Sequence, residues 1–457
     1  MQRTWSVALA VGAALVLAPV ALGASPSPSH HEAQGGPVSF DTPAAQLRVD
    51  LDRLLAEHAF LTIEQMRSGL TDSPDFAAAA TAVEGNSTDV ANAIGSVYGD
   101  AAVAPFGDIW RSHIGYLVDY SVALGKDDAD ASAKALEGLT VYRANLREFL
   151  AGANPGISLA GITEALDTHT AQLVAFIDLE HQGDHAGAYE IEREAYPHMF
   201  DIGDALAKVI ANKFPDRFGG LEVAYSSAGT LRVTLDRLLG EHAFLAAEAM
   251  RSGVGGQDYF DAAKSALDAN TADLQALVAA AYGQDGGAAF REHWDAHIAA
   301  YLEYIDAAKA GDATAKAAAL DRVNQYASEI AAFLASANPN LDANAVTGLL
   351  QQHAGHLTGQ VDAFTAQDYD GTYAKVREGY SHMFTAGEAL AGAIATQFPD
   401  KFPSANGAPA TDVDGGLHGG HAPDPFGVLT LISIFGLGVA GASIAWLVHG
   451  RGLRRRG

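Results

Sequence analysis

The chain has no cysteine among its 457 residues, and it has only 28 lysine and arginine residues against 55 aspartate and glutamate residues. Without cysteine there are no disulfides, no thiolate metal ligands and no thiol nucleophile, so any metal must be held by nitrogen, oxygen or thioether sulfur. The net charge of −27 repels nucleic acid and anionic lipid, and it concentrates cations near the surface. We therefore expect no nucleic-acid partner.

Several catalytic motifs are missing as well. The sequence contains no His-Glu-x-x-His, no Gly-x-Ser-x-Gly, no phosphate-binding Gly-x-x-x-x-Gly-Lys and no Cys-x-x-Cys-His. It also lacks a Glu-x-x-His pair that recurs along the chain, which is the signature of carboxylate-bridged di-iron bundles. No nucleophile or acid–base pair stands out, so the sequence favours a binding protein over an enzyme.

What the chain does contain is an internal duplication. A shift of 184 residues aligns the chain with itself without a gap, and the tryptophan of each copy, Trp110 or Trp294, coincides in this alignment. Four histidines of each copy also coincide, whereas the remaining histidines have no histidine partner. The matched histidines are the primary candidate ligands: His58, His113, His169 and His198 in the first copy, and His242, His297, His353 and His382 in the second.

The two ends of the chain predict export and membrane anchoring. Residues 1–24 combine an early arginine, an apolar run and small residues, which is typical of a cleavable signal peptide. Residues 426–449 are apolar and long enough for a transmembrane helix, and residues 450–457 are rich in arginine. We expect a single-pass protein of the cell membrane with a basic cytoplasmic tail and with the bulk of the chain extracytoplasmic.

Between these ends, the sequence predicts an all-α fold. Alanine, leucine and acidic residues dominate, and apolar residues recur at three- and four-residue spacing. Helical bundles of about six antiparallel helices each are expected at 44–218 and 231–402, joined by a linker at 219–230 and flanked by flexible segments at 25–43 and 403–425. The helices of the first bundle are expected near 44–68, 75–98, 103–124, 129–151, 158–182 and 185–213.

The matched histidines are expected at one depth in each bundle. Counted from a shared end of antiparallel helices, the four of the first copy differ in height by roughly 3 Å. Imidazoles at one level on facing helices predict a metal or haem site in the core. The alternative is that each histidine is half-buried and hydrogen-bonded to a nearby carboxylate, such as Glu57 or Glu194.

A second set of matched residues is expected near the histidines. Two carboxylate positions lie roughly 9 Å above the histidine level, where they orient the ligands, bind a second cation, or form salt bridges with Arg67 or Arg251. Their proximity to arginine favours the salt bridge. The residues are Glu64 and Glu248, which precede Arg67 and Arg251, and Asp119 and Glu303.

The matched methionines have two interpretations. They fill the core, which is the usual role of methionine, or they supply a thioether ligand to copper. Four neutral imidazoles without thiolate suit zinc, copper, nickel or bis-histidine haem. The methionines are Met66, Met199, Met250 and Met383.

The most closely matched stretches of the two copies carry a family resemblance. LDRLLAEHAFLTIEQMRSG and LDRLLGEHAFLAAEAMRSG, with EAYPHMF and EGYSHMF, resemble an uncharacterised bacterial exported helical domain, often duplicated, that is sometimes labelled copper amine oxidase-like. The resemblance covers both copies and implies copper. Copper amine oxidases are β-rich and carry an Asn-Tyr cofactor precursor and a His-x-His copper pair, and neither pattern occurs in this chain.

Three functional hypotheses follow. The first is a membrane-anchored extracytoplasmic protein that binds a copper or zinc ion, or haem, at one histidine-rich site per bundle for storage, sensing or delivery. The second is a structural or protein-interaction module that binds no metal. The third is a metal-dependent redox enzyme, which requires an open coordination position.

Overall fold

The computed structural model describes residues 38–404, and the regular structure of these residues is entirely helical. The predicted all-α fold is confirmed. The first copy consists of α1 (Pro43–Thr71), α2 (Phe76–Tyr98), the short 3-10 helix η1 (Asp100–Ala102), α3 (Val103–Gly125), α4 (Ala129–Ala153), α5 (Leu159–Gln182) and α6 (His185–Lys213). After α7 (Leu221–Ala224), the second copy consists of α8 (Ser227–Gly255), α9 (Phe260–Tyr282), α10 (Gln284–Ala310), α11 (Ala313–Ala337), α12 (Ala343–Thr365) and α13 (Tyr369–Gln397).

The duplication extends to the helix boundaries. The helices α1, α2, α4 and α6 are followed 184 residues later by α8, α9, α11 and α13, with both ends shifted equally. Matched polar residues start several of these helices: the side chains of Asp128 and Asp312 accept hydrogen bonds from the first turns of α4 and α11, and Asp184 and Asp368 do the same for α6 and α13. The copies therefore repeat the same design of six helices.

The ends of the predicted segments differ from the structure in two places. The segment 219–230, predicted as a linker, contains α7 and the first residues of α8. The segment 25–43, predicted as flexible, ends in ordered backbone, because Phe40 is buried in the core of the second copy. An apolar side chain close to a bundle gains more from burial than its segment loses in freedom.

The terminal predictions concern other parts of the chain. The signal peptide at 1–24, the transmembrane helix at 426–449 and the basic tail at 450–457 lie outside the described residues. Among the helices within 38–404, none has the length and apolar character needed to cross a membrane.

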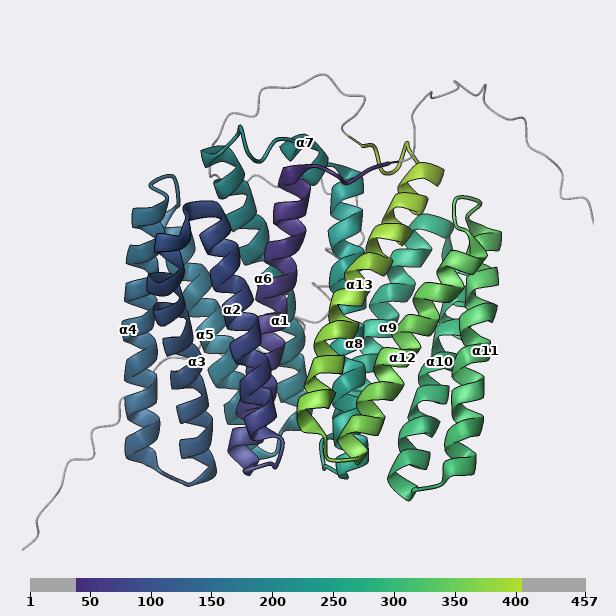
Figure 1. Ribbon diagram of the computed structural model, residues 1–457, viewed down its shortest axis with the longest axis horizontal. Coiled ribbons are helices and arrows are strands. Elements are labelled where there is room, and N and C mark those ends of the chain that lie inside the picture. Colours follow the sequence, from purple (N-terminus) through teal and green to yellow (C-terminus); the bar gives the residue numbers. More distant parts are fainter. Residues whose placement is uncertain (1–37, 405–457) are drawn as a thin grey trace, which may run out of the picture. The chain divides into compact units, whose positions relative to one another are not determined.

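The helices α1 and α8 occupy the centres of their bundles. Each packs against four helices of its own copy, and α4 and α11 lie on the outer sides (Figure 1). Consequently, α1 and α8 are buried on nearly all sides, whereas α4 buries only Ala135, Leu139, Tyr142 and Leu146. A helix buried all round must place its polar residues inside the protein, where they need partners.

The two copies pack against each other with approximate two-fold symmetry. The rings of Phe60 and Phe244 stack with their centroids 3.7 Å apart, and the hydroxyl of Tyr196 donates to that of its counterpart Tyr380 over 3.2 Å. These pairs consist of equivalent residues, as expected for a contact on a two-fold axis. The two copies therefore form one compact unit rather than two independent domains.

Ion pairs across this contact obey the same symmetry. Arg193 pairs with Glu241 at 3.0 Å and with Asp273 at 2.6 Å, and the equivalent Arg377 pairs with Glu57 at 2.9 Å and with Asp89 at 2.7 Å.

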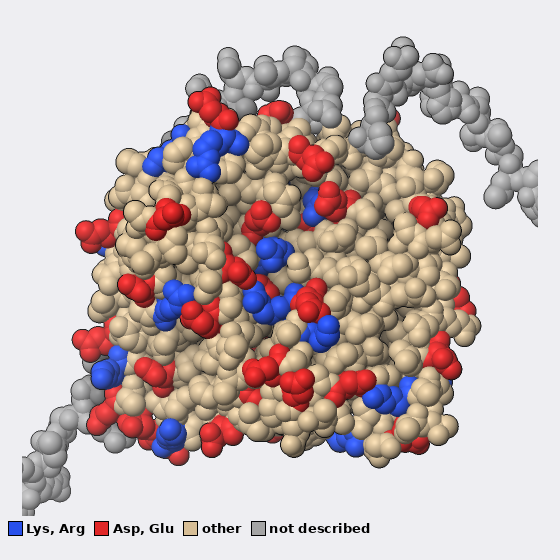
Figure 2. All heavy atoms as spheres, in the orientation of Figure 1, with Lys and Arg blue, Asp and Glu red and all other residues tan. Residues whose placement is uncertain are grey.

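The visible face of the molecule carries scattered acidic side chains with basic ones among them, without a continuous basic patch (Figure 2).

A larger buried network surrounds Arg67. Its guanidinium lies 2.8 Å from Glu64, 3.1 Å from Glu180, 3.6 Å from Glu192 and 2.6 Å from Glu248 of the other copy, and these side chains are at most 7% exposed. Burial raises the pKa of Glu64 to about 7, although Arg251 and Arg67 lie beside it. The arginine therefore compensates several carboxylates that have no access to solvent.

The equivalent Arg251 completes the network from the second copy. It lies 3.4 Å from Glu64 and 2.6 Å from Asp75, and it donates to the hydroxyls of Ser68 and Tyr259. Both arginines thus bridge the copies. The matched pairs Glu64–Arg67 and Glu248–Arg251, for which the sequence favours salt bridges, belong to this network, although Glu248 pairs with the arginine of the opposite copy.

We predict that Arg67→Met destabilises the protein by about 3 to 5 kcal/mol, because it removes the guanidinium that pairs with the buried carboxylates of Glu192 and Glu248. Arg111→Met is the matched control, because Arg111 forms a 2.7 Å pair with Glu84 in which both side chains are more than a third exposed. Such a pair contributes about 1 kcal/mol or less. Urea unfolding followed by circular dichroism measures both, and equal effects of the two substitutions would contradict the prediction.

Candidate metal centre

Three histidines of the first copy meet in the centre of its bundle. His58 lies on α1, His113 on α3 and His169 on α5, and their exposed fractions are 0, 0 and 3%. Each contributes one ring nitrogen to a group whose members all lie within 4.8 Å of one another. The three helices are alternate members of an up-and-down bundle, so their side chains converge on its axis at one level.

The second copy repeats the group. His242 on α8, His297 on α10 and His353 on α12 bring three ring nitrogens within the same 4.8 Å limit and are at most 7% exposed. Two buried histidine triads that could hold a metal ion are therefore present in the described part of the chain. Of the residues that the structure describes, no aspartate or glutamate belongs to either triad.

The spacing of the nitrogens is close to that of metal ligands. Nε2 of His58 lies 3.1 Å from Nε2 of His113, and the equivalent distance between His242 and His297 is 3.4 Å. With Zn–N bonds of about 2.0 to 2.1 Å and tetrahedral angles, two ligand nitrogens lie about 3.3 Å apart. The two closest nitrogens of each triad can thus bind one ion with little movement.

Backbone carbonyls orient one histidine of each triad. Nδ1 of His113 donates to the carbonyl of Trp110, and Nδ1 of His297 donates to that of Trp294 over 2.5 Å. A carbonyl only accepts, so the proton is on Nδ1 and the lone pair of Nε2 points into the triad. Hydrogen bonds of this kind to the second nitrogen are usual for histidines that bind metals.

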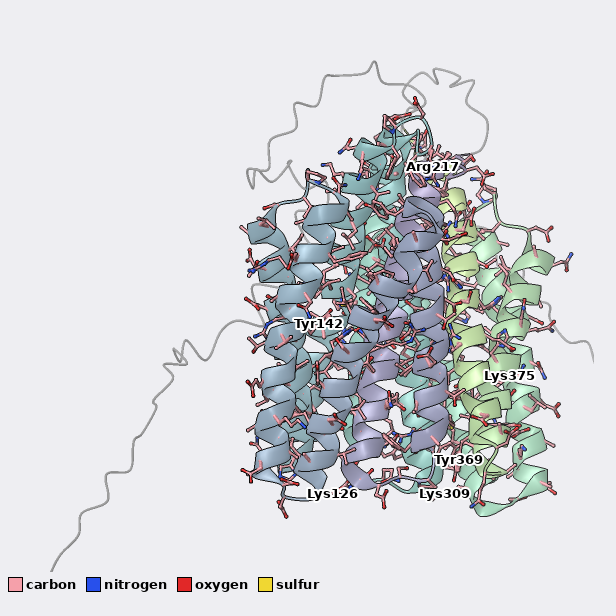
Figure 3. The ribbon with its side chains drawn as sticks, turned by 60° about the vertical axis from the view of Figure 1, so that its left-hand side comes forward. Lys126, Tyr142, Arg217, Lys309, Tyr369 and Lys375 are labelled. Carbon is pink, nitrogen blue, oxygen red and sulfur yellow. The ribbon has the colours of Figure 1, made fainter. Side chains whose placement is uncertain are left out.

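Aromatic rings enclose the triads. Tyr142 of α4 stacks on His113 with centroids 4.3 Å apart, and Trp110 lies 4.5 Å from the ring of His58. In Figure 3, Tyr142 lies between Arg217 near one end of the first bundle and Lys126 at the other, which places the triad well inside the bundle. The second copy repeats this arrangement with Tyr326 and Trp294.

His169 and His353 have no hydrogen bond within the described residues. Both ring nitrogens of each are buried and lack a protein partner. A buried polar group without a partner costs free energy, and such groups are rare in folded proteins. The ring nitrogens of the two histidines are therefore free to bind a ligand.

The fourth matched histidine takes a different position. Nε2 of His198 lies 3.1 Å from the carbonyl of Ala165, Nε2 of His382 lies 2.8 Å from that of Leu349, and neither histidine belongs to a triad. Both lie on the last helix of their copy, where the next residue is buried methionine. Consecutive helical positions point about 100° apart, so the histidine points in a different direction from the methionine, toward a backbone carbonyl of α5 or α12.

The other candidates do not lie with the triads. Asp119 and Glu303 are exposed, and Glu303 pairs with Arg322. Glu64 and Glu248 belong to the arginine network. All four methionines pack in the hydrophobic cores: Met66, Met199, Met250 and Met383.

The aromatic residues Tyr142 and Tyr326 were not among the candidates derived from the sequence. They obey the same 184-residue offset as the histidines. The 184-residue offset could therefore have identified these tyrosines, but a tyrosine that packs against a histidine has no distinctive sequence spacing of its own.

We predict that protonation of the triads destabilises the metal-free protein in acid. Burial lowers the pKa of His113, His169 and His353 to about 3 and that of His297 to about 4, compared with 6.5 for a free imidazole. Below pH 6.5, the unfolded chain takes up protons that the folded chain does not. The free energy of unfolding therefore decreases as the pH is lowered, by up to about 1.4 kcal/mol per pH unit for each histidine. Above pH 6.5, these groups do not change it.

The test compares urea unfolding of the wild type and of His169→Leu/His353→Leu in chelator between pH 7 and pH 4. Below pH 6, the free energy of unfolding is expected to depend less steeply on pH in the double variant than in the wild type. The difference between the two slopes is up to about 3 kcal/mol per pH unit. Parallel pH profiles would show that these two imidazoles titrate normally in the folded protein.

Comparison with models of protein families, with curated proteins and with solved structures finds no match for this chain. The resemblance to an exported helical domain consequently stays a prediction. Any functional conclusion has to come from the triads and their surroundings.

Proposed function

We propose that each bundle binds one metal ion through its histidine triad: His58, His113 and His169 in the first copy, and His242, His297 and His353 in the second. The observation that carries this proposal is the convergence of three buried, neutral imidazoles, one of which has no other partner. Neutral imidazole is the form that binds metals, and the lowered pKa values keep these rings neutral at physiological pH.

The donor set favours zinc or copper. Imidazole nitrogens suit both ions, whereas magnesium and calcium prefer oxygen ligands, and the triads contain no carboxylate among the described residues. A single ion also fits better than haem, because the two closest nitrogens of each triad lie 3.1 and 3.4 Å apart, whereas the two axial nitrogens of a bis-histidine haem lie on opposite faces of the porphyrin, roughly 4 Å apart. Three protein ligands leave a fourth coordination position open.

The burial of the triads supports a long-lived ion. All six histidines are at most 7% exposed, so the ion has to pass between packed helices to leave. Storage of the ion, or its use as a fixed centre, fits this burial better than rapid delivery. With the leader expected at 1–24 and the anchor at 426–449, we propose that the protein holds these ions outside the cytoplasmic membrane.

Calorimetric titration of chelator-treated protein with Zn²⁺ and Cu²⁺ tests the proposal. We predict two ions per chain for the wild type, and one ion per chain for His113→Ala or His297→Ala, because each substitution removes a ligand from one triad. An ion at 100 times its dissociation constant is expected to stabilise the fold by about 2.7 kcal/mol. This stabilisation raises the melting temperature.

The variant His198→Ala/His382→Ala is the matched control. It removes the matched histidines that lie outside the triads, and it is expected to keep both ions. If the wild type binds neither ion, or if the triad variants bind as many ions as the wild type, the metal proposal is wrong. The alternative of a structural or protein-interaction module would then account for the fold.

A further inference from the structure

A large apolar cavity lies inside the second bundle next to its triad. Its volume is about 330 Å³, and all six helices of the bundle contribute to its lining. Most of the lining is aliphatic or aromatic, for example Leu239, Phe290, Trp294, Ile330 and Met383. Protein interiors are packed so closely that voids larger than a water molecule are few, so a space of this size requires an explanation.

The size of the cavity is that of a ligand site. Pockets for small molecules measure about 300 to 1,000 Å³ and are lined mainly by apolar groups with a few polar ones. An apolar space of about 150 Å³ is already enough to take up benzene in another protein. Ala389 lines the cavity and is exposed, so α13 offers a route from the surface.

The polar groups of the lining define the kind of ligand. His353 lines the cavity with two buried ring nitrogens that have no partner among residues 38–404, and His382 lines it as well. In the metal-bound form proposed above, one nitrogen of His353 holds the ion, and the other remains for a hydrogen bond to a guest. The lining contains no lysine or arginine, so a carboxylate or phosphate would lack a counter-charge inside an apolar space.

We propose that the second bundle binds a neutral, apolar small molecule that carries one oxygen atom, such as a ketone, an ester or an alcohol with an aromatic or medium-length aliphatic body. The apolar body fills the cavity, and the oxygen hydrogen-bonds to His353. The neighbouring metal rests on the function proposed above, whereas the cavity does not depend on it. The guest adds a second kind of ligand beside the metal ion.

The first copy supplies a conservative way to fill the cavity. Ala386 lines it, and the equivalent residue of the first copy is Ile202; Val346 lines it, and its equivalent is Ile162. Ala386→Ile and Val346→Ile therefore introduce side chains that the same helical design already accommodates. Thr385→Ile is the matched control, because Thr385 is the neighbouring, exposed residue of α13.

The test uses the neutral naphthyl ketone prodan, whose emission shifts to the blue in apolar surroundings, with full-length protein in chelator. We expect saturable binding of one prodan per chain. Ala386→Ile is expected to weaken it at least ten-fold, Val346→Ile to weaken it less, and Thr385→Ile to leave it unchanged. Thermal melts show whether Ala386→Ile is folded, and if it is not, Val346→Ile decides the comparison.

The metal and cavity proposals fail separately in this experiment. His297→Ala removes a triad ligand that does not line the cavity, so it is expected to lose a metal ion and to keep prodan binding. Non-saturable prodan binding, or equal binding by folded Ala386→Ile and Thr385→Ile, would overturn the cavity proposal whatever the metal titration gives. Wild-type protein that binds prodan but no metal would overturn only the metal proposal.

Discussion

The burial of α1 and α8 on nearly all sides is the constraint from which the rest of the structure follows. A helix in this position cannot turn a polar side chain to solvent, so every histidine, carboxylate and arginine on it needs a partner inside the protein. Two of the buried polar residues of α1 lead to the two main polar clusters of the first copy. His58 meets the other histidines of its bundle, and Arg67 meets carboxylates of both copies.

The approximate two-fold contact explains why the copies act as one unit. Equivalent residues meet across it, and each copy supplies an arginine to the carboxylates of the other. A contact of this type is the usual interface of a symmetric dimer. The chain therefore holds two equivalent bundles in a symmetric arrangement, and the histidine triads are part of the repeated unit.

The sequence predicted the fold better than the site. Helical periodicity and the breaker residues located the helices to within a few residues, because both signals are local. The 184-residue offset selected His58, His113 and His169 correctly as residues that come together, but it also selected His198. Depth along the helix can be counted from sequence, whereas the face that a helix turns inward depends on its packing, and this decided that Met199 rather than His198 faces the core.

Ion-pair partners that are far apart in the chain could not be predicted from the sequence either. The pairing of Glu64 with Arg67 is visible at helical spacing, but nothing local indicates that Glu180, Glu192 and Glu248 share the same arginine. The cavity results from the packing of six helices. The difference between Ala386 and its equivalent Ile202 can be related to the cavity only once the lining residues are known. Such features depend on contacts between residues that are far apart in the chain.

We propose that three imidazoles in each bundle surround one metal ion. Crystals of zinc-loaded protein, measured on both sides of the zinc absorption edge, test it most directly. Two anomalous peaks per chain are expected, each about 2.0 to 2.1 Å from a ring nitrogen of all three histidines of a triad. Anomalous peaks only at surface carboxylates, with the triads unchanged and free of zinc, would contradict it.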